Sequence, residues 1–154
     1  MARKFAFALQ PVLDHRKRIE DERKQTMALR QRALDEAKAE LRRLDDEFRR
    51  HASDLRARHR QLDVEELRVH YAHLQYLDRS ILAQRGVVAE RQGAADRARK
   101  ELVEASKSRK VVDKLKERKR AVFVAEELRI EQLELDDGNA RRHGRAARQS
   151  GGAS

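Results

Sequence analysis

The sequence predicts an all-α fold in which two long helices form an antiparallel coiled-coil hairpin. Apolar residues recur at seven-residue spacing in two successive series, as coiled-coil seams require. The frame shifts between the series, where Asp63 and Glu66 have the spacing of a helix-capping box. The first series is Met27, Leu34, Leu41, Phe48, Leu55 and Leu62, and the second is Leu67, Leu74, Ile81, Val88, Ala95 and Leu102. A register break at a helix start indicates that one helix ends, the chain turns and a second helix begins.

The composition suits a thin helical seam better than a globular core. Of the 154 residues, 42% are charged and 4% are aromatic, and the net charge is +10. High charge is also typical of disorder, but a disordered chain has no reason to keep a heptad register. There is no cysteine, no apolar run approaches the roughly 20 residues of a membrane span, and the N-terminus lacks a signal-peptide pattern. We therefore expect a cytoplasmic protein that favours acidic partners.

The boundaries of the elements follow from local signals. Residues 1–10 are expected to form an apolar arm, because Phe5, Phe7 and Leu9 alternate instead of following a helical period. Pro11 suits the first turn of a helix, so the first helix is predicted over about residues 11–61. The second helix is predicted over about residues 64–137, because Gly138 stands where a C-terminal cap is expected. Residues 138–154, rich in arginine and small residues, are expected to be a disordered basic tail.

The second helix is predicted to extend beyond the first. Its end still carries apolar residues at helical spacing, namely Leu115, Val122, Phe123, Ile130 and Leu133. An apolar stripe of this kind needs a cover. The sequence leaves open whether the N-terminal arm or another molecule supplies it.

Signals of catalysis are absent from the sequence. The glycines form no phosphate-binding loop, and serines and histidines do not cluster as catalytic residues do. His70 and His73 supply two ligands of a metal site but no third. We therefore expect no enzymatic activity, no cofactor, no metal and no small-molecule substrate. Tyr76, which lies off the apolar series beside His73, is expected to be an exposed aromatic near the bend.

The end of the second helix carries charge of both signs. A basic stretch comes first, formed by Lys107, Arg109, Lys110, Lys114, Lys116, Arg118, Lys119 and Arg120. An acidic stretch follows, formed by Glu126, Glu127, Glu131, Glu134, Asp136 and Asp137. Phosphates would repel the acidic stretch, so the pattern favours a protein partner with charges of both signs over nucleic acid.

Three segments, in order along the chain, resemble the flagellar export protein FliJ family, a soluble component of the flagellar type III secretion apparatus. The first is Phe5-x-Phe7-x-Leu9-Gln10-x-Val12-Leu13, followed by Arg16. The second is Glu65-Glu66-Leu67 followed by Tyr71-x-x-Leu74-x-x-Leu77. The third runs from Arg109 to Arg118, with Glu131-Gln132-x-Glu134-Leu135-Asp136 after it. Leu133 and the arginine-rich tail depart from the family pattern.

The resemblance implies a coiled-coil stalk, similar to the central stalk subunit of rotary ATPases, at the inner-membrane export apparatus. Such a stalk inserts into the hexameric ring of the flagellar export ATPase and promotes its hexamerisation and activity. It also contacts the cytoplasmic domain of the export gate and handles export chaperones. The ring-binding residues it implies are Phe5, Phe7, Leu9, Arg109, Lys110, Lys114, Arg118, Lys119, Glu131 and Glu134. The gate-binding residues it implies are His73, Tyr76 and Leu77.

Two other interpretations stay open at this point. One is a coiled-coil adaptor or stalk of another secretion system. The other is a basic helical protein that binds nucleic acid through the second helix and the tail.

Overall fold

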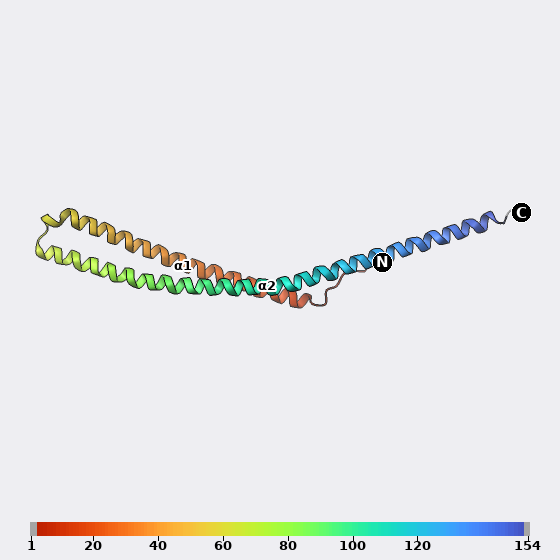
Figure 1. Ribbon diagram of the computed structural model, residues 1–154, viewed down its shortest axis with the longest axis horizontal. Coiled ribbons are helices and arrows are strands. Elements are labelled where there is room, and N and C mark those ends of the chain that lie inside the picture. The colour runs from red at the N-terminus through yellow and green to blue at the C-terminus, as the bar shows by residue number, and fades with distance from the viewer. Residues whose placement is uncertain (1–2, 153–154) are drawn as a thin grey trace. The chain divides into compact units, whose positions relative to one another are not determined.

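The computed structural model describes residues 3–152, which form two long helices joined by a short turn (Figure 1). Helix α1 spans Gln10–Arg58, the 3₁₀ turn η1 spans His59–Gln61, and helix α2 spans Val64–Ser150. The chain divides into two compact units. We call residues 18–107 the hairpin unit and residues 1–17 with 108–154 the end unit.

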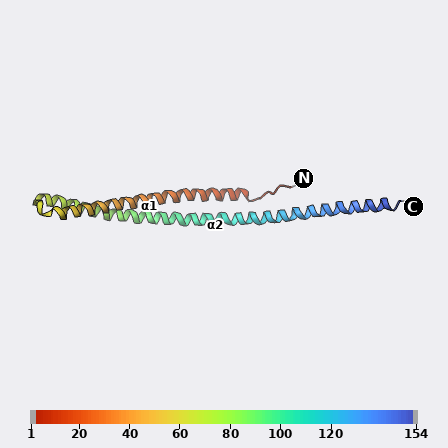
Figure 2. The same cartoon turned by 90° about the horizontal axis from the view of Figure 1, so that it is seen from above.

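In the hairpin unit α1 and α2 run antiparallel and side by side, which confirms the predicted fold (Figure 1 and Figure 2). Every residue of the two predicted apolar series is buried or half-buried. A cluster of buried side chains forms where Leu44 of α1 meets Leu77 and Ile81 of α2, with Leu41 and Phe48 packed beside it. The apolar seam is therefore the core of this unit.

The seam also uses a second row of residues on α2. Leu77, Ala98 and Ala105 are buried, and all three stand at multiples of seven residues from one another. Hydrogen bonds also join the two helices beside the apolar seam. The Gln84 side-chain amide on α2 donates to the Ala37 carbonyl on α1 at 3.0 Å. The buried carboxylate of Glu20 accepts a 3.1 Å hydrogen bond from the Ser106 hydroxyl.

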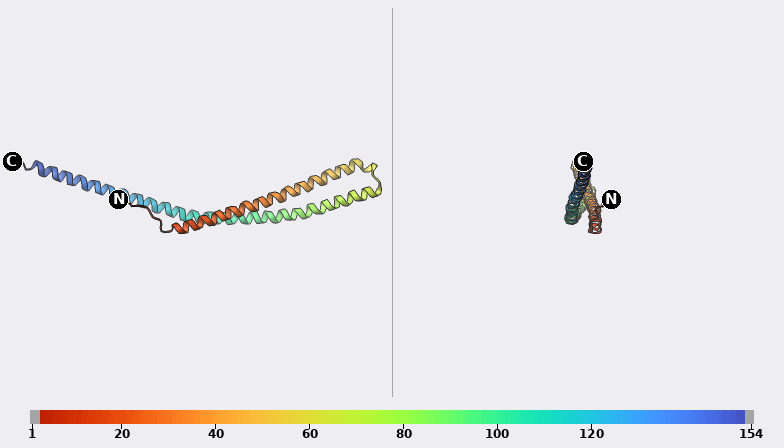
Figure 3. Two further views of the ribbon diagram at one scale, coloured as in Figure 1. Left: turned by 180° about the vertical axis from the view of Figure 1, so that it is seen from behind. Right: turned by 90° about the vertical axis from the view of Figure 1, so that its right-hand side faces the viewer.

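The turn between the helices carries the predicted capping box. The Glu66 amide donates to Asp63 Oδ1 at 2.8 Å, and the Asp63 amide donates to Glu66 Oε2 at 3.1 Å. This exchange satisfies backbone donors that have no partner within the first turn of a helix. It explains why α2 begins at Val64, as predicted. Figure 3 shows this connection from behind, where it joins the neighbouring ends of the two helices.

In the end unit, residues 3–7 form neither helix nor strand, and α1 begins at Gln10, one position before the predicted start. The Leu9 carbonyl accepts the first helical hydrogen bond, from the Leu13 amide at 2.9 Å. Leu13 and Val112 are buried in this unit. Met1 and Ala2, the first residues of the predicted arm, lie outside the described residues.

The predicted end of the second helix at about residue 137 is wrong. Helix α2 continues to Ser150, and no glycine among the described residues adopts the positive φ of a C-terminal cap. Alanine and arginine favour helix, and a single glycine costs only about 1 kcal/mol, so Gly138 does not stop it. The helix ends at the paired glycines Gly151 and Gly152. Residues 138–150 are thus helical in the structure, and Ala153 and Ser154 lie outside the described part.

Candidate partner-binding surfaces

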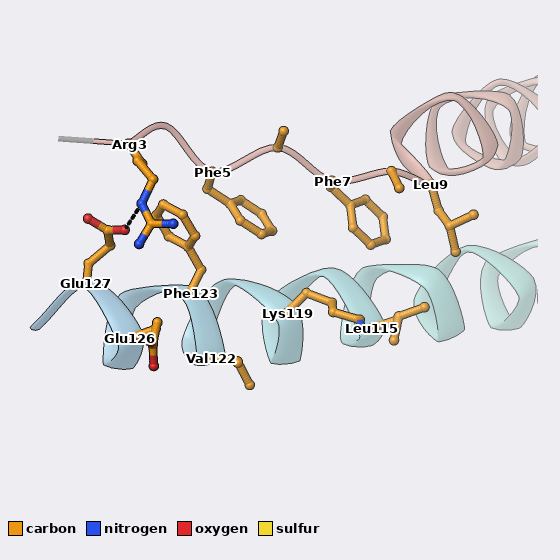
Figure 4. Close-up of a pocket in the computed structure, with 12 residues that line it drawn as sticks. Arg3, Phe5, Phe7, Leu9, Leu115, Lys119, Val122, Phe123, Glu126 and Glu127 are labelled. Atoms are coloured by element: carbon orange, nitrogen blue, oxygen red, sulfur yellow. Dashed lines mark ion pairs between the residues drawn. The ribbon is translucent and has the colours of Figure 1, made fainter. Parts of the chain in front are cut away.

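In the end unit the N-terminal arm lies along α2 and covers one apolar face of that helix. The Phe5 and Phe123 rings lie 5.6 Å apart between centroids, and Arg3 Nε is 2.9 Å from Glu127 Oε1. Figure 4 shows Phe5, Phe7 and Leu9 on the side of the arm that faces α2. The sequence left open whether the N-terminal arm or another molecule covers the apolar stripe of Leu115 and Phe123. In the structure the N-terminal arm covers it.

The cover is incomplete. A hollow of about 580 Å³ remains between the arm and α2. Leu9 and Val122, which both line it, are exposed, whereas Phe5 and Phe7 are half-buried. The arm and the helix together present a mixed surface, with apolar side chains in the hollow and Lys119 and Glu126 beside them.

The basic stretch of α2 contains both paired and exposed side chains. Arg109 is half-buried and forms an ion pair with Asp113 on the next turn. The others among the predicted ring-binding cations are exposed and form no ion pair with any residue that the structure describes: Lys110, Lys114, Arg118 and Lys119. The Arg16 guanidinium reaches across from α1 and donates to the Ser108 carbonyl at 2.7 Å. The end unit thus holds Arg109 in place and leaves Lys110, Lys114, Arg118 and Lys119 accessible.

The acidic stretch that follows is almost entirely exposed. Glu131 and Glu134, both predicted to bind the ring, have no ion pair within residues 3–152. Glu126 accepts hydrogen bonds from Arg129, at 2.8 Å and 3.2 Å. These bonds lower the pKa of the Glu126 carboxyl and raise that of the Arg129 guanidinium. The α2 part of the end unit therefore presents exposed cations in its basic stretch and exposed carboxylates at Glu131 and Glu134.

The structure also reveals an apolar stripe that sequence reasoning missed. Val124, Leu128 and Leu135 are exposed and stand at i, i+4 and i+11 along α2, so they share one side of the helix. At 100° per residue this side is opposite the one that carries Val122, Glu126 and Ile130. The i, i+4 spacing of Val124 and Leu128 was the available signal. The seven-residue period does not mark these positions, because all three lie outside the two apolar series.

Near the bend, in the hairpin unit, three imidazoles from the two helices meet. The ring centroid of His51 on α1 lies 5.3 Å from that of His70 and 4.4 Å from that of His73, both on α2. His51 Nε2 and His70 Nδ1 are 3.2 Å apart, and His73 Nε2 is 3.8 Å from Glu47 Oε1. Burial, followed by the nearby charges of His73 and His70, lowers the pKa of the His51 imidazole.

The three predicted gate-binding residues do not share one surface. Tyr76 is 65% exposed and stacks on His73, with 6.3 Å between the ring centroids, as expected for an aromatic off the apolar series. Leu77, in contrast, is 1% exposed and belongs to the core cluster. Its predicted place on a binding surface is wrong, because it stands on the second seam row of α2. A hollow of about 440 Å³ lies close to the bend, lined by Leu55, Tyr71 and Leu74 with three basic side chains.

The described residues contain neither a group of side chains that could hold a metal ion nor a helix that could span a membrane. The three histidines do not form a group with the arrangement that could hold a metal ion, and no other such group occurs between residues 3 and 152. Within the same range, neither helix contains a stretch apolar enough to cross a lipid bilayer.

Comparison with known proteins supplies the family. A family model described as "Flagellar FliJ protein" matches residues 5–148. None of the curated proteins matches the sequence. A solved structure of a putative YscO homolog, CT670 from Chlamydia trachomatis, is similar, with a TM-score of 0.43 and 19% sequence identity over 94% of this chain and 99% of that one. Because the family model covers both helices and the arm from Phe5 onward, the chain belongs to the flagellar FliJ protein family.

Proposed function

We propose that this protein is a non-enzymatic stalk whose end unit binds the hexameric ring of the flagellar export ATPase. Binding promotes assembly of the hexamer and ATP hydrolysis, and the protein acts in the cytoplasm at the inner-membrane export apparatus. It needs no cofactor and no small-molecule substrate of its own. Membership of the flagellar family supports a role in flagellar secretion, and the surface of the end unit supports the ring as partner.

The observation that carries the proposal is the set of exposed cations beside an incompletely covered apolar hollow. Lys114 and Arg118 stand one helical turn apart, and Lys119 borders the hollow beside Phe7. Glu131 and Glu134 add exposed carboxylates farther along α2. Interfaces combine an apolar contact with a polar rim, and charges of both signs fix the register of docking. The stripe of Val124 and Leu128 offers a second apolar contact to the same partner.

Reversing the charge of Lys114, Arg118 and Lys119 to glutamate is expected to abolish stimulation of the cognate ATPase. Like charges brought face to face across an interface cost several kcal/mol, so ring binding weakens at least about tenfold. ATP hydrolysis is measured with increasing amounts of the variant, and hexamer formation is followed by size-exclusion chromatography. Circular dichroism should show unchanged helicity, because all three side chains are exposed.

The matched control reverses Arg32, Arg42 and Arg49, three exposed cations of the hairpin unit. It makes the same change in net charge and should stimulate the ATPase as the wild-type protein does. Full stimulation by the end-unit variant would remove its cations from the mechanism. Equal loss in both variants would show that net charge alone matters.

We further propose that the surface around His73 and Tyr76 contacts the cytoplasmic domain of the export gate, and that the protein handles export chaperones. The exposed Tyr76 ring, stacked on His73, has the character of an interface anchor. Tyr76→Ala is expected to weaken binding to the isolated gate domain by about tenfold or more. Val69→Ala, which removes another exposed apolar side chain near the bend, is the control in the same titration. Identical affinities of the two variants would exclude Tyr76 from the contact.

A further inference from the structure

The last turns of α2 carry four arginines on one side of the helix. Arg141, Arg145 and Arg148 stand at i, i+4 and i+7, and Arg142 lies three residues before Arg145. With 100° between successive residues, the four side chains fall within about 120° of the helix circumference. We call these four residues the arginine face. It exists only because residues 138–150 are helical.

The arginine face has no partner within the described part of the chain. Residues 139–152 are all exposed, and the four arginines form no ion pair with any residue from 3 to 152. No aspartate or glutamate occurs among residues 138–152. The opposite side of the helix carries small residues, among them Ala140 and Ala147. Any partner must therefore be held by charge and not by apolar contact.

The four arginines lie on one side of the helix, and this placement distinguishes a planar anionic surface from nucleic acid as the partner. We propose that the arginine face docks on an anionic lipid surface. A membrane surface is planar and presents its phosphates to one side of a helix, which is where all four arginines lie. A helix in a nucleic-acid groove meets phosphates on both of its sides, and single strands are held by stacking on aromatic rings. His143 carries the one aromatic ring among residues 138–152, so successive bases have no series of rings on which to stack, and the side of the helix opposite the arginine face carries no arginine.

The strength of this docking follows from the number of charges. Each arginine close to an anionic lipid surface strengthens binding roughly fivefold, and the effect fades within a Debye length. Loss of three arginines should therefore weaken binding on the order of a hundredfold, and high salt should do the same. Lipid docking is independent of the ATPase ring, because lipid binding is measured with this chain alone.

The experiment uses the full chain and vesicles containing about one-third phosphatidylglycerol in phosphatidylcholine, with sedimentation at low salt as the readout. The wild-type protein should bind these vesicles, release them at high salt and ignore pure phosphatidylcholine. The variant Arg141→Gln/Arg145→Gln/Arg148→Gln should lose binding on the order of a hundredfold. The matched control Arg32→Gln/Arg42→Gln/Arg49→Gln removes the same charge from exposed sites of the hairpin unit and should bind as the wild type does.

A second variant tests the one-sided arrangement at constant composition. Arg141→Ala and Arg148→Ala combined with Ala140→Arg and Ala147→Arg move two charges to the opposite side of the helix, and lipid binding should weaken severalfold. Unchanged binding by this variant would overturn the assignment of a planar face. Equal losses of lipid binding in the glutamine variant and its matched control would show that the arginine face is not the lipid-binding site. Tighter binding to duplex DNA than to the vesicles, with the same dependence on the three arginines, would assign the surface to nucleic acid instead.

Discussion

Leu77→Ala is expected to lower the free energy of unfolding by about 2–4 kcal/mol, the usual cost of removing a buried leucine side chain from a packed core. Leu77 is 1% exposed and packs in the cluster with Leu44 and Ile81. A two-helix seam has few other apolar contacts to compensate for the loss. The change is measured by urea denaturation followed by circular dichroism.

Leu82→Ala is the matched control, because it removes the same atoms from a side chain of α2 that is 69% exposed. Its expected effect is within about 0.5 kcal/mol. Gate binding by Leu77→Ala, measured where the protein is still folded, should stay close to that of the wild type. If the Leu77→Ala protein is stable but no longer binds the gate domain, Leu77 takes part in gate binding.

Acidification below about pH 6.5 is expected to destabilise the hairpin unit through the histidine cluster at the bend. The pKa of His51 is lowered in the folded protein from its ordinary value near 6.5, mainly by burial and then by His73 and His70. The unfolded chain therefore binds a proton there before the folded chain does. The stabilisation is fully present above the unfolded pKa and is lost as the pH falls, with a slope of at most about 1.4 kcal/mol per pH unit for one proton.

The measurement is the urea midpoint at a series of pH values between neutrality and the range where carboxylates titrate. Glu47 and Asp54 are the acidic groups whose charges oppose the lowering of the His51 pKa. His51→Gln keeps a polar side chain but cannot be protonated, so it should flatten the pH dependence. A wild-type midpoint that does not change with pH would contradict the role of the cluster. A slope retained in His51→Gln would assign the effect to other groups.

The sequence was sufficient to predict the hairpin and its turn, because both depend on local rules. A seven-residue period specifies which side of a helix is buried, and Asp63 with Glu66 forms a cap from residues three apart. The packing of Phe5 against Phe123 was one of two alternatives that the apolar pattern allowed. Only the three-dimensional structure could decide between an internal cover and an external one.

The remaining errors have physical causes. The family resemblance alone placed Leu77 on the gate-binding surface, whereas a seam of two helices buries two rows of each helix and Leu77 stands on one of these rows. Gly138 matches the pattern of a C-terminal cap, but a glycine within a helix costs only about 1 kcal/mol and neighbouring alanines offset that cost, so α2 continues past it. The arginine face depends on this continuation of the helix, which the cap pattern at Gly138 does not predict. The partners of the exposed charges depend on molecules outside this chain.

The single turn of the hairpin unit also bears on the order in which its contacts form. The side-chain contact between His51 and His70 joins residues that are 19 positions apart in the sequence. The hydrogen bond from Gln84 to the Ala37 carbonyl joins residues 47 positions apart, and the hydrogen bond from Arg23 to Glu101 joins residues 78 positions apart. Closing a long loop in one step costs more conformational entropy than extending a hairpin already closed at the turn. The helices should therefore pair progressively from the turn toward the chain ends, as a zipper does. In such a process the capped turn is a folding nucleus, and the contacts farthest from it are the last to form and the first to open.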